Sequence, residues 1–545
     1  MPSTLTYPGI YIEEIPSGVR TITGVSTSIM AIIDFFTRGE MNKPIQITSF
    51  MDFERKLGGL DGRSEGSYAI LQYYLNDGQI AWVIRVASGT PLPAMIELRD
   101  QASSPQRALL LEAASPGVWG VNVQVAIGHI AGQAEQFNLV VRELSSGSDP
   151  KQVLSSEVHL GLSMKTTDPR FVKNVLASES ALVRVSARST AIGLGNIPAS
   201  TAAPLTPTST EVEDITSPGV VGSADSKSFF SLGNDPDDPT QEPNDGNPPE
   251  DAATLVNGMK TLDTIAPEIF NILCLPRAAA LPTGEMQIAY TEAKKYCEDK
   301  RAFLIIDIPE TTNTLEDMKT WKNVTGAGFR SNNAAVYYPR LEIPDRMNEN
   351  RPRNVGASGT LAGVYARTDS TRGVWKAPAG TEALLVGANV IHKLTDLENG
   401  TLNVQGVNIL RCFPIFGCVS WGARTMNGAN QQPSDWRYIP VRRMALFLEE
   451  SLYQGLKWVV FEPNDEPLWA SIRLNVGAFL QSLFRQGAFQ GKTPREAYLV
   501  KCDKDTTTQA DINNGIVNIV VGFAPLKPAE FVVIKIQQLA GQIPT

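Results

Sequence analysis

The stretch from about residue 255 to residue 343 alternates apolar segments with amphipathic ones, and this alternation limits the fold more than any other feature. Apolar runs typical of buried strands occupy residues 269–276, 302–309 and 334–343. Between them, residues 286–300 and 314–324 place apolar side chains at helical spacing, with Thr314 as a suitable cap. Strands that alternate with helices predict a parallel sheet with right-handed crossovers. We therefore expect an α/β fold with a mixed central sheet flanked by helices.

The segments before residue 252 divide into two types. Residues 25–36 and 81–87 are apolar runs typical of buried strands, and residues 67–78 have helical spacing. We assign residues 21–90 to the first part of the core and residues 252–424 to its central part. Residues 91–251 contain short alternating segments, such as 122–128 and 137–144, separated by turns. This pattern predicts a β-rich domain inserted into the core.

The end of this insertion, residues 200–251, is rich in Thr, Pro and acidic residues. Between Glu211 and Asp251 there are eleven acidic residues and one basic residue, Lys227. A segment of this composition buries too little apolar surface to offset the entropy lost on ordering. We expect a solvated, mobile loop, and an acidic docking segment is the alternative.

Two strong helical patterns follow the central core, at residues 441–456 and 467–487. Pro467 suits the first turn of the second helix, and Gly487 suits its end. Residues 515–525 then have the composition of a strand. We assign residues 425–523 to a C-terminal domain.

Both ends of the sequence contain strand patterns, "YPGIYIEEI" at residues 7–15 and "EFVVIKI" at residues 530–536. We assign residues 1–20 and 524–545 to two extended arms. A strand with an unpaired edge is a template for pairing with another chain, so arms of this kind predict subunits joined by strand exchange. Short hinges would flank them, at residues 16–18 and 525–528. The residues expected to pair are Tyr7, Ile10, Tyr11, Ile12, Glu530, Phe531, Val532, Val533, Ile534 and Ile536.

Composition excludes several classes of protein. A net charge of −9 without a basic run argues against nucleic-acid binding. No apolar run is long enough to span a membrane, and the first residues do not have the pattern of a signal peptide. The five cysteines are an odd, sparse set, which favours reduced thiols in a protein made in the cytoplasm.

Two segments resemble catalytic motifs, and each lacks a residue that its motif requires. "GAFQGKT" at residues 487–493 resembles a phosphate loop, but it has one residue too few between its glycines and follows a helix, so we predict a helix end and a turn. Ser358 lies in "GASGT", where Thr360 breaks the nucleophile-elbow pattern. No histidine supports a triad with it. The three histidines are His129, His159 and His392.

Cys412 and Cys418, in "CFPIFGC", have no second pair nearby, and their spacing is poor for zinc. We expect two buried thiols in a strand or turn. We accordingly predict a chain without catalytic residues, cofactor or metal, which is typical of a structural protein.

At three places in order, the sequence resembles the contractile tail sheath proteins of phages and related injection systems. The first is "YPGIYIEEIPSG", and the second is "GTLAGVYARTDSTRGVWKAPAG" at residues 359–380. The third comprises residues 461–503, which begin "FEPNDEPLW", and residues 524–538. The resemblance does not extend to residues 90–251, where sheaths vary in the size of their insertion.

This resemblance implies a subunit of stacked sixfold rings that contract around an inner tube and drive it through a target envelope. It implies a subtilisin-like core without the triad, an outward insertion and a C-terminal domain near the tube. The expected partners are further copies of the chain, the inner tube protein, and the baseplate and terminal cap proteins, with neither nucleic acid nor membrane insertion. The particle would assemble in the cytoplasm as a phage tail, or as a released or anchored tail-like particle.

Basic residues on the C-terminal helices are candidates for the tube contact, although a core helix with solvated basic edges explains the same pattern. The candidates are Arg473, Arg485, Lys492, Arg442 and Arg443. The alternative functions are a degenerate subtilisin-like serine hydrolase and an outer adhesive particle protein.

Overall fold

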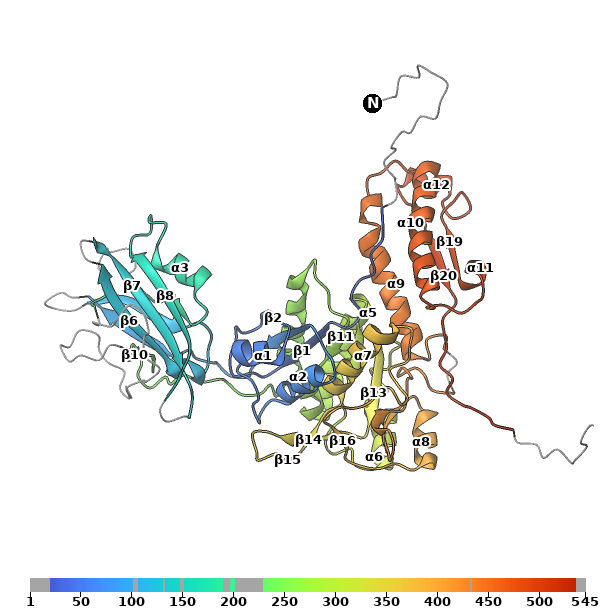
Figure 1. The fold of residues 1–545 in the computed structure, drawn as a ribbon, viewed down its shortest axis with the longest axis horizontal. Coiled ribbons are helices and arrows are strands. Elements are labelled where there is room, and N and C mark those ends of the chain that lie inside the picture. The colour runs from blue at the N-terminus through green and yellow to red at the C-terminus, as the bar shows by residue number, and fades with distance from the viewer. Residues whose placement is uncertain are drawn as a thin grey trace, which may run out of the picture.

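The computed structural model describes residues 20–100, 106–130, 133–147, 151–189, 197–200, 229–431 and 434–535. Figure 1 shows the β-rich insertion, the α/β core and the C-terminal domain from left to right. The predicted N-terminal strand, with Tyr7, Ile10, Tyr11 and Ile12, lies outside the described residues, as does Ile536. Within the described ranges, no helix combines the length and the apolar character needed to cross a membrane.

The core is built on an eight-stranded sheet with the order β18-β17-β13-β12-β11-β1-β3-β2. The strands from β17 to β3 run parallel, and the outer strands β18 and β2 are antiparallel to their neighbours. The predicted parallel sheet is therefore confirmed. The strands are β1 (Met30–Asp34), β2 (Pro44–Ile47), β3 (Ala81–Arg85), β11 (Ile272–Cys274), β12 (Phe303–Ile306), β13 (Ala334–Tyr338), β17 (Asn408–Phe413) and β18 (Gly417–Ser420).

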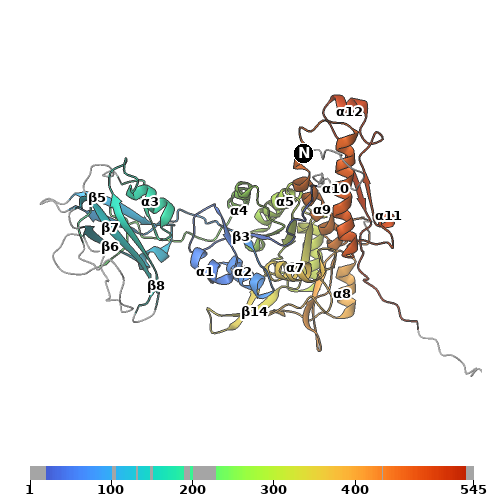
Figure 2. The same cartoon turned by 45° about the horizontal axis from the view of Figure 1, so that its top comes forward.

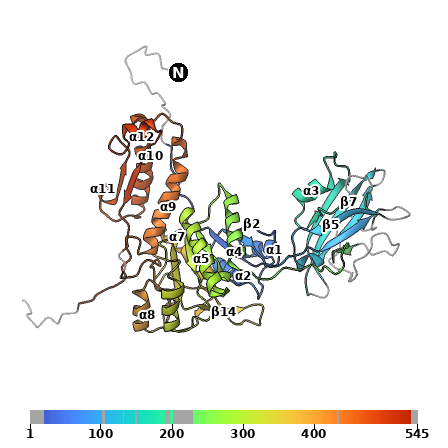
Figure 3. The ribbon, with the colours of Figure 1, turned by 180° about the vertical axis from the view of Figure 1, so that it is seen from behind.

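Helices cover both faces of this sheet, as Figure 3 shows from behind. Side chains alternate between the faces: Ile32 packs with the helices of one face and Ile33 with those of the other. The first face carries α1 (Phe50–Leu57), α2 (Glu65–Leu75) and α7 (Ser358–Arg372). The second carries α4 (Ala252–Lys260), α5 (Thr283–Asp299), α6 (Leu315–Thr320) and α8 (Asp396–Asn403). The three-stranded sheet β14 (Leu341–Asp345), β15 (Arg351–Val355) and β16 (Asn389–Val390) adjoins the core.

Helices α2 and α7 pack at backbone distance because two glycines of α7 lie one turn apart at the contact. A Cβ atom on Gly359 would lie 2.3 Å from the carbonyl oxygen of Ala69, and one on Gly363 would lie 2.6 Å from Cβ of Asn76. Residues 358–366 of α7 are all buried, so this helix has no polar face over that length. The signature "GTLAGVY" thus forms a close helix–helix contact.

The insertion contains two antiparallel sheets around a core of its own, which agrees with the predicted β-rich domain. The four-stranded sheet has the order β10-β6-β7-β8, and the three-stranded sheet has the order β4-β5-β9. Its elements are β4 (Met95–Arg99), β5 (Arg107–Ala113), β6 (Val123–Ile130), β7 (Gln133–Leu144), β8 (Val153–Ser163), α3 (Val172–Glu179), β9 (Val183–Val185) and β10 (Phe230–Ser231).

The acidic segment returns from the insertion to the core as a paired strand-like connection. Isolated bridges join Gly233 to Met95, Asn244 to Leu92 and Asn247 to Ser88. Its aspartates form ion pairs, which are Asp235–Arg188 at 2.7 Å, Asp237–Arg107 at 2.5 Å and Asp245–Arg63 at 2.8 Å. The predicted solvated loop is therefore partly wrong for residues 229–250, because basic residues distant in sequence pair with three of its six acidic residues and bridges tie it to the chain before β5. Residues 201–228 lie outside the described part.

The C-terminal domain packs two long helices against a two-stranded sheet. Ile22 belongs to its core, so residues just after the N-terminal arm pack here and not on the α/β sheet. In Figures 1 and 2 the domain stands at the end opposite to the insertion. Its elements are α9 (Ile439–Gly455), α10 (Glu466–Arg485), α11 (Pro494–Ala497), β19 (Tyr498–Lys501), α12 (Gln509–Asn513) and β20 (Val520–Phe523).

Cys412 and Cys418 form a disulfide across the hairpin of β17 and β18. The antiparallel register places the two residues directly opposite each other, with 3.8 Å between their Cα atoms. The prediction of reduced thiols is wrong for this pair, because sequence spacing alone does not reveal the register. Cys274, Cys297 and Cys502 are free and buried.

Candidate assembly interface

Polar side chains meet at the carboxyl end of the central sheet, where the incomplete nucleophile motif lies. Asp307 follows β12, and Ser358 is the first residue of α7. The Ser358 amide donates to Oδ1 of Asp307 at 2.9 Å, and its hydroxyl donates to Oδ2 of the same carboxylate. Asp34, at the end of β1, accepts the amides of Phe35 and Gly66 at 2.6 and 2.7 Å. The cluster thus ties two helix starts to two strand ends.

Burial dominates the electrostatics of this cluster. Loss of hydration raises the pKa of Asp34 to about 7, against the lowering effect of its two amide donors. Burial likewise raises the pKa of Asp307, and the Ser358 hydrogen bond opposes it. The two carboxyl groups therefore hold protons more readily than exposed aspartates do.

This arrangement is closed to a substrate. Ser358 is 1% exposed, and its amide and its hydroxyl both donate to Asp307. Among the described residues no histidine is hydrogen-bonded to the Ser358 hydroxyl. His129 is hydrogen-bonded to the Pro198 carbonyl, and His159 to Glu157. Ser358 is consequently held as a structural donor. The predicted turn after α10 is confirmed, since Gly487 and Gly491 both have positive φ.

The described residues also contain no converging group of three His, Cys, Asp or Glu side chains that could hold a metal ion.

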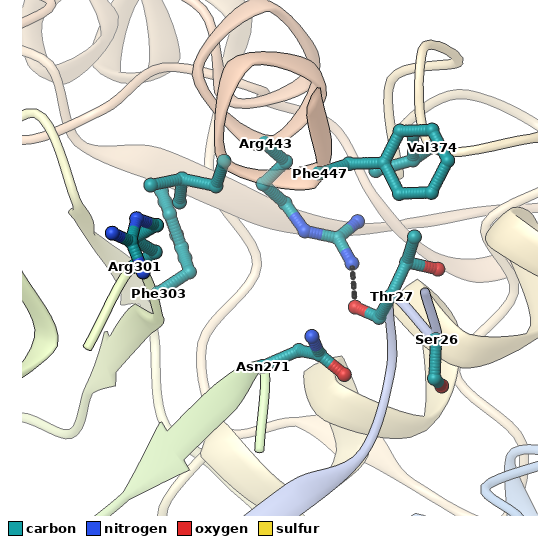
Figure 4. A pocket seen from close by; sticks show the side chains of 9 residues that line it. Ser26, Thr27, Asn271, Arg301, Phe303, Val374, Arg443 and Phe447 are labelled. Carbon is teal, nitrogen blue, oxygen red and sulfur yellow. Dashed lines mark hydrogen bonds between the residues drawn. The ribbon is translucent and has the colours of Figure 1, made fainter. Parts of the chain in front are cut away.

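Arg443 lies at the joint between the core and the C-terminal domain, and its prediction as a tube-facing residue is wrong. Figure 4 shows its guanidinium directed into a small pocket toward Thr27, whose carbonyl accepts a hydrogen bond at 2.9 Å. A buried ion pair joins it to Asp369 of α7 at 2.6 Å. A charge that is buried and paired holds the domains together and cannot contact another protein.

Two further candidates are engaged within the chain. Arg442 is mostly buried and donates to Asn333 at 2.6 Å and to Glu449 at 3.1 Å. Arg473 pairs with Glu466 at 2.6 Å. Arg485 and Lys492 differ, because both are exposed, at the end of α10 and in the turn after it. These two remain the candidates for a charged contact.

The two-stranded sheet of the C-terminal domain offers open edges. Strands β19 and β20 pair only with each other among the described elements. Leu499 of β19 and Val520 of β20 are about half exposed. Unpaired sheet edges that carry exposed apolar residues are sites where a further strand can add.

The tail after β20 leaves the body of the molecule, as Figures 1 and 2 show. Phe531, Val532, Val533 and Ile534 are 73–81% exposed. No strand is assigned to residues 524–535. The Glu530 carboxylate is bound by Arg424 of the same chain, and the strand pairing of its backbone stays a prediction. No local sequence signal reveals this contact, since the partners are 106 residues apart.

A buried serine, an exposed apolar tail and an unpaired sheet edge are features expected of a protein that works by assembly with other chains. Two family models identify the family. The model for the phage tail sheath protein central domain matches residues 251–426, and that for the phage tail sheath C-terminal domain matches residues 431–538. Together they cover just over half of the chain. The chain belongs to the phage tail sheath family, which confirms the predicted resemblance.

Individual relatives agree with this assignment. The tail sheath protein of Vibrio phage KVP40 is 31% identical over 141 residues, which are 26% of this chain and 20% of the relative. That of Enterobacteria phage T4 is 24% identical over 217 residues, which are 38% of this chain and 31% of the relative. The matches thus span less than a third of these curated relatives.

Solved structures share the fold over nearly the whole chain. The sheath complex of the extracellular contractile injection system PVC in its contracted state has a TM-score of 0.55 and 20% identity, with 99% of each chain covered. The contracted helical sheath of the anti-feeding prophage has a TM-score of 0.54 and 22% identity, covering 98% of this chain and 100% of that one. The sheath tail protein Lin1278 from Listeria innocua has a TM-score of 0.56 and 13% identity, covering 93% and 96%.

Proposed function

We propose that the chain is the sheath subunit of a contractile phage tail or of a phage-tail-like injection system. Copies would stack as sixfold rings around an inner tube and contract to drive that tube through a target envelope. The family assignment and the neighbours solved in contracted states support this function. Contraction would need no nucleotide, because burial of surface in the compact lattice supplies free energy.

The observation that carries the proposal is the exposed apolar run at residues 531–534. Four successive apolar side chains in water are unfavourable, and burial of each would contribute about 1.5–3 kcal/mol. Strand pairing with another subunit would bury them and satisfy their backbone groups. The open sheet of β19 and β20 in a neighbouring copy is a suitable acceptor. Contacts that repeat head to tail without closing generate a helical tube.

The core would serve this function as a rigid body without catalysis. We propose a subtilisin-like core that has no triad, in which Asp34 ends the first parallel strand and Ser358 begins a helix. The sealed Ser358 disfavours the hydrolase alternative. The partners would be further copies, an inner tube protein, and baseplate and cap proteins, with assembly in the cytoplasm.

Negative-stain microscopy of the chain expressed alone tests this function. We expect striated tubes or short, wide polysheaths, because the exposed tail and the open sheet allow unlimited addition of subunits. Isolated particles that never elongate at high concentration would contradict the proposal and favour the outer adhesive protein.

Arg485 and Lys492 are the proposed tube contact, as exposed cations near the end of α10. Each exposed ion pair contributes only about 0.2–1 kcal/mol, so such contacts specify register and still break on contraction. Because many identical subunits would each contribute such pairs, the sheath as a whole would bind the tube strongly.

The double substitution Arg485→Glu and Lys492→Glu, co-expressed with the tube protein, is expected to give empty, contracted sheaths. The reason is that repulsion from an acidic tube wall would stop the tube from templating the extended state. Electron microscopy would count filled and empty particles. The matched control is Lys173→Glu with Arg346→Glu, which reverses two exposed cations on the insertion and the core. Filled, extended particles in normal yield would place the tube contact elsewhere.

A further inference from the structure

The C-terminal tail is held by its own chain at two places before it leaves the molecule. The Ala524 amide donates to Ala497 at 2.8 Å, and Ala524 accepts the Gln490 amide at 2.9 Å, so the tail is held at its start. Residues 526–529 then make no hydrogen bond among those described for this part of the chain. At Glu530 the tail is bound again, and after it the side chains are exposed.

The Glu530 carboxylate receives four hydrogen bonds from three segments of the chain. Arg424 donates from Nε and Nη2, each at 2.6 Å, which is a bidentate ion pair. Asn403, at the end of α8, donates from Nδ2 at 3.0 Å. The hydroxyl of Tyr438, which precedes α9, donates at 3.2 Å. Arg424, the main donor, lowers the pKa of Glu530 against the opposing effect of burial.

Arg424 is positioned to receive a carboxylate. Its side chain is 1% exposed, and Nη1 is fixed by the Asn403 carbonyl at 3.0 Å, the Gly428 carbonyl at 3.2 Å and Oδ1 of Asn430 at 2.8 Å. Glu530 is the one carboxylate paired with it among the described residues. A buried cation requires such a partner, because a charge without hydration or a counterion is strongly unfavourable.

We propose that Arg424, Asn403 and Tyr438 form a receptor for Glu530, a latch that fixes where the C-terminal arm leaves its own subunit. This inference rests on the proposed function, in which the residues after the latch pair with a neighbour. Without the latch, the free arm begins after Pro525 and samples many more directions. With the latch, the arm begins at Phe531 and is pre-organised for pairing, which lowers the entropy lost on assembly. Glu530 is thus a positioning residue.

The test compares full-length Glu530→Gln with wild type by chymotrypsin cleavage after Phe531, followed by intact mass spectrometry. We expect several-fold faster cleavage, because the neutral amide removes the ion pair and frees the segment that the protease must bind. Glu530→Asp, which keeps the charge, should cleave at an intermediate rate. The matched control is Glu382→Gln, which removes an exposed ion pair with Arg372 and should cleave at the wild-type rate. Electron microscopy of the uncleaved proteins should show fewer tubes for Glu530→Gln than for wild type, and as many for the Glu382→Gln control as for wild type.

The two proposals fail in different ways. Cleavage of Glu530→Gln at the wild-type rate would overturn the latch, whether or not the wild type forms tubes. Faster cleavage with no tubes from the wild type would support the latch and overturn the proposed function. If Glu530→Gln does not fold, Asn403→Ala removes one donor and keeps the ion pair. It should raise the cleavage rate by a smaller factor, and an unchanged rate would count against the latch.

Discussion

A chain that ends at Glu530 is expected to fold as the full-length chain does and to form no tubes. The truncation removes the exposed apolar run of residues 531–534, which contributes little buried surface to its own subunit. It keeps Glu530, so Arg424 stays paired. Deletion of residues 1–16, the predicted N-terminal strand, should abolish tubes in the same way. Sedimentation and negative-stain microscopy would measure assembly, and circular dichroism would report the fold.

A shorter chain that ends at Lys527 provides the control for this experiment. It removes Glu530 and leaves Arg424 without its carboxylate. We expect a loss of about 2 kcal/mol in stability, at the low end for a broken buried pair because the truncation also admits water. Both truncations should fail to assemble, and only the shorter one should be destabilised. Normal tubes from the chain that ends at Glu530 would show that the exposed run does not join subunits.

The substitution Gly359→Ala is expected to destabilise the core by about 3 kcal/mol, the upper end of the usual cost of overpacking. Its Cβ would lie 2.3 Å from the Ala69 carbonyl oxygen and 2.5 Å from the Ala69 Cα. Those are backbone atoms, so no rotamer change relieves the contact, and α7 must move away from α2. A lower midpoint of urea denaturation, followed by intrinsic fluorescence, would measure the effect.

Gly477→Ala is the matched control, because Gly477 lies within α10 and a Cβ there would meet no atom within 4 Å. Alanine is favoured over glycine inside a helix by about 0.5–1 kcal/mol, so this substitution should raise the midpoint. Equal midpoints for Gly359→Ala and wild type would mean that α2 and α7 are not held at backbone distance.

The central sheet could be predicted from the sequence because its strands are continuous apolar runs, and that pattern comes from burial on both faces. Helix α7 could not be found in the same way. Residues 358–366 are buried on all sides, so the segment has no amphipathic period and its glycines argue against a helix. The pair Gly359 and Gly363, four residues apart, was the one local signal of close helix packing.

The sequence-based predictions that wrongly placed charged residues in solvent failed for one physical reason. The ion-pair partners of these residues lie far away in the sequence. Arg443 follows a helical pattern that suits a surface position, yet Asp369 neutralises it in the interior. The acidic connection has a composition typical of disorder, yet Arg188 and Arg107 pair with its aspartates. Composition measures how much charge a segment carries, and it does not reveal what the fold places opposite that charge.

The two passages between core and insertion are joined to each other, by bridges from Ser88 to Asn247 and from Leu92 to Asn244. A domain attached in this way has its first and last residues close together at the core. Its replacement by another domain with close ends therefore leaves the distance between the two connections to the core unchanged. Any foreign domain whose ends lie as close together as adjacent strands could be grafted there. The insertion can therefore be exchanged for another domain while the α/β core keeps its geometry.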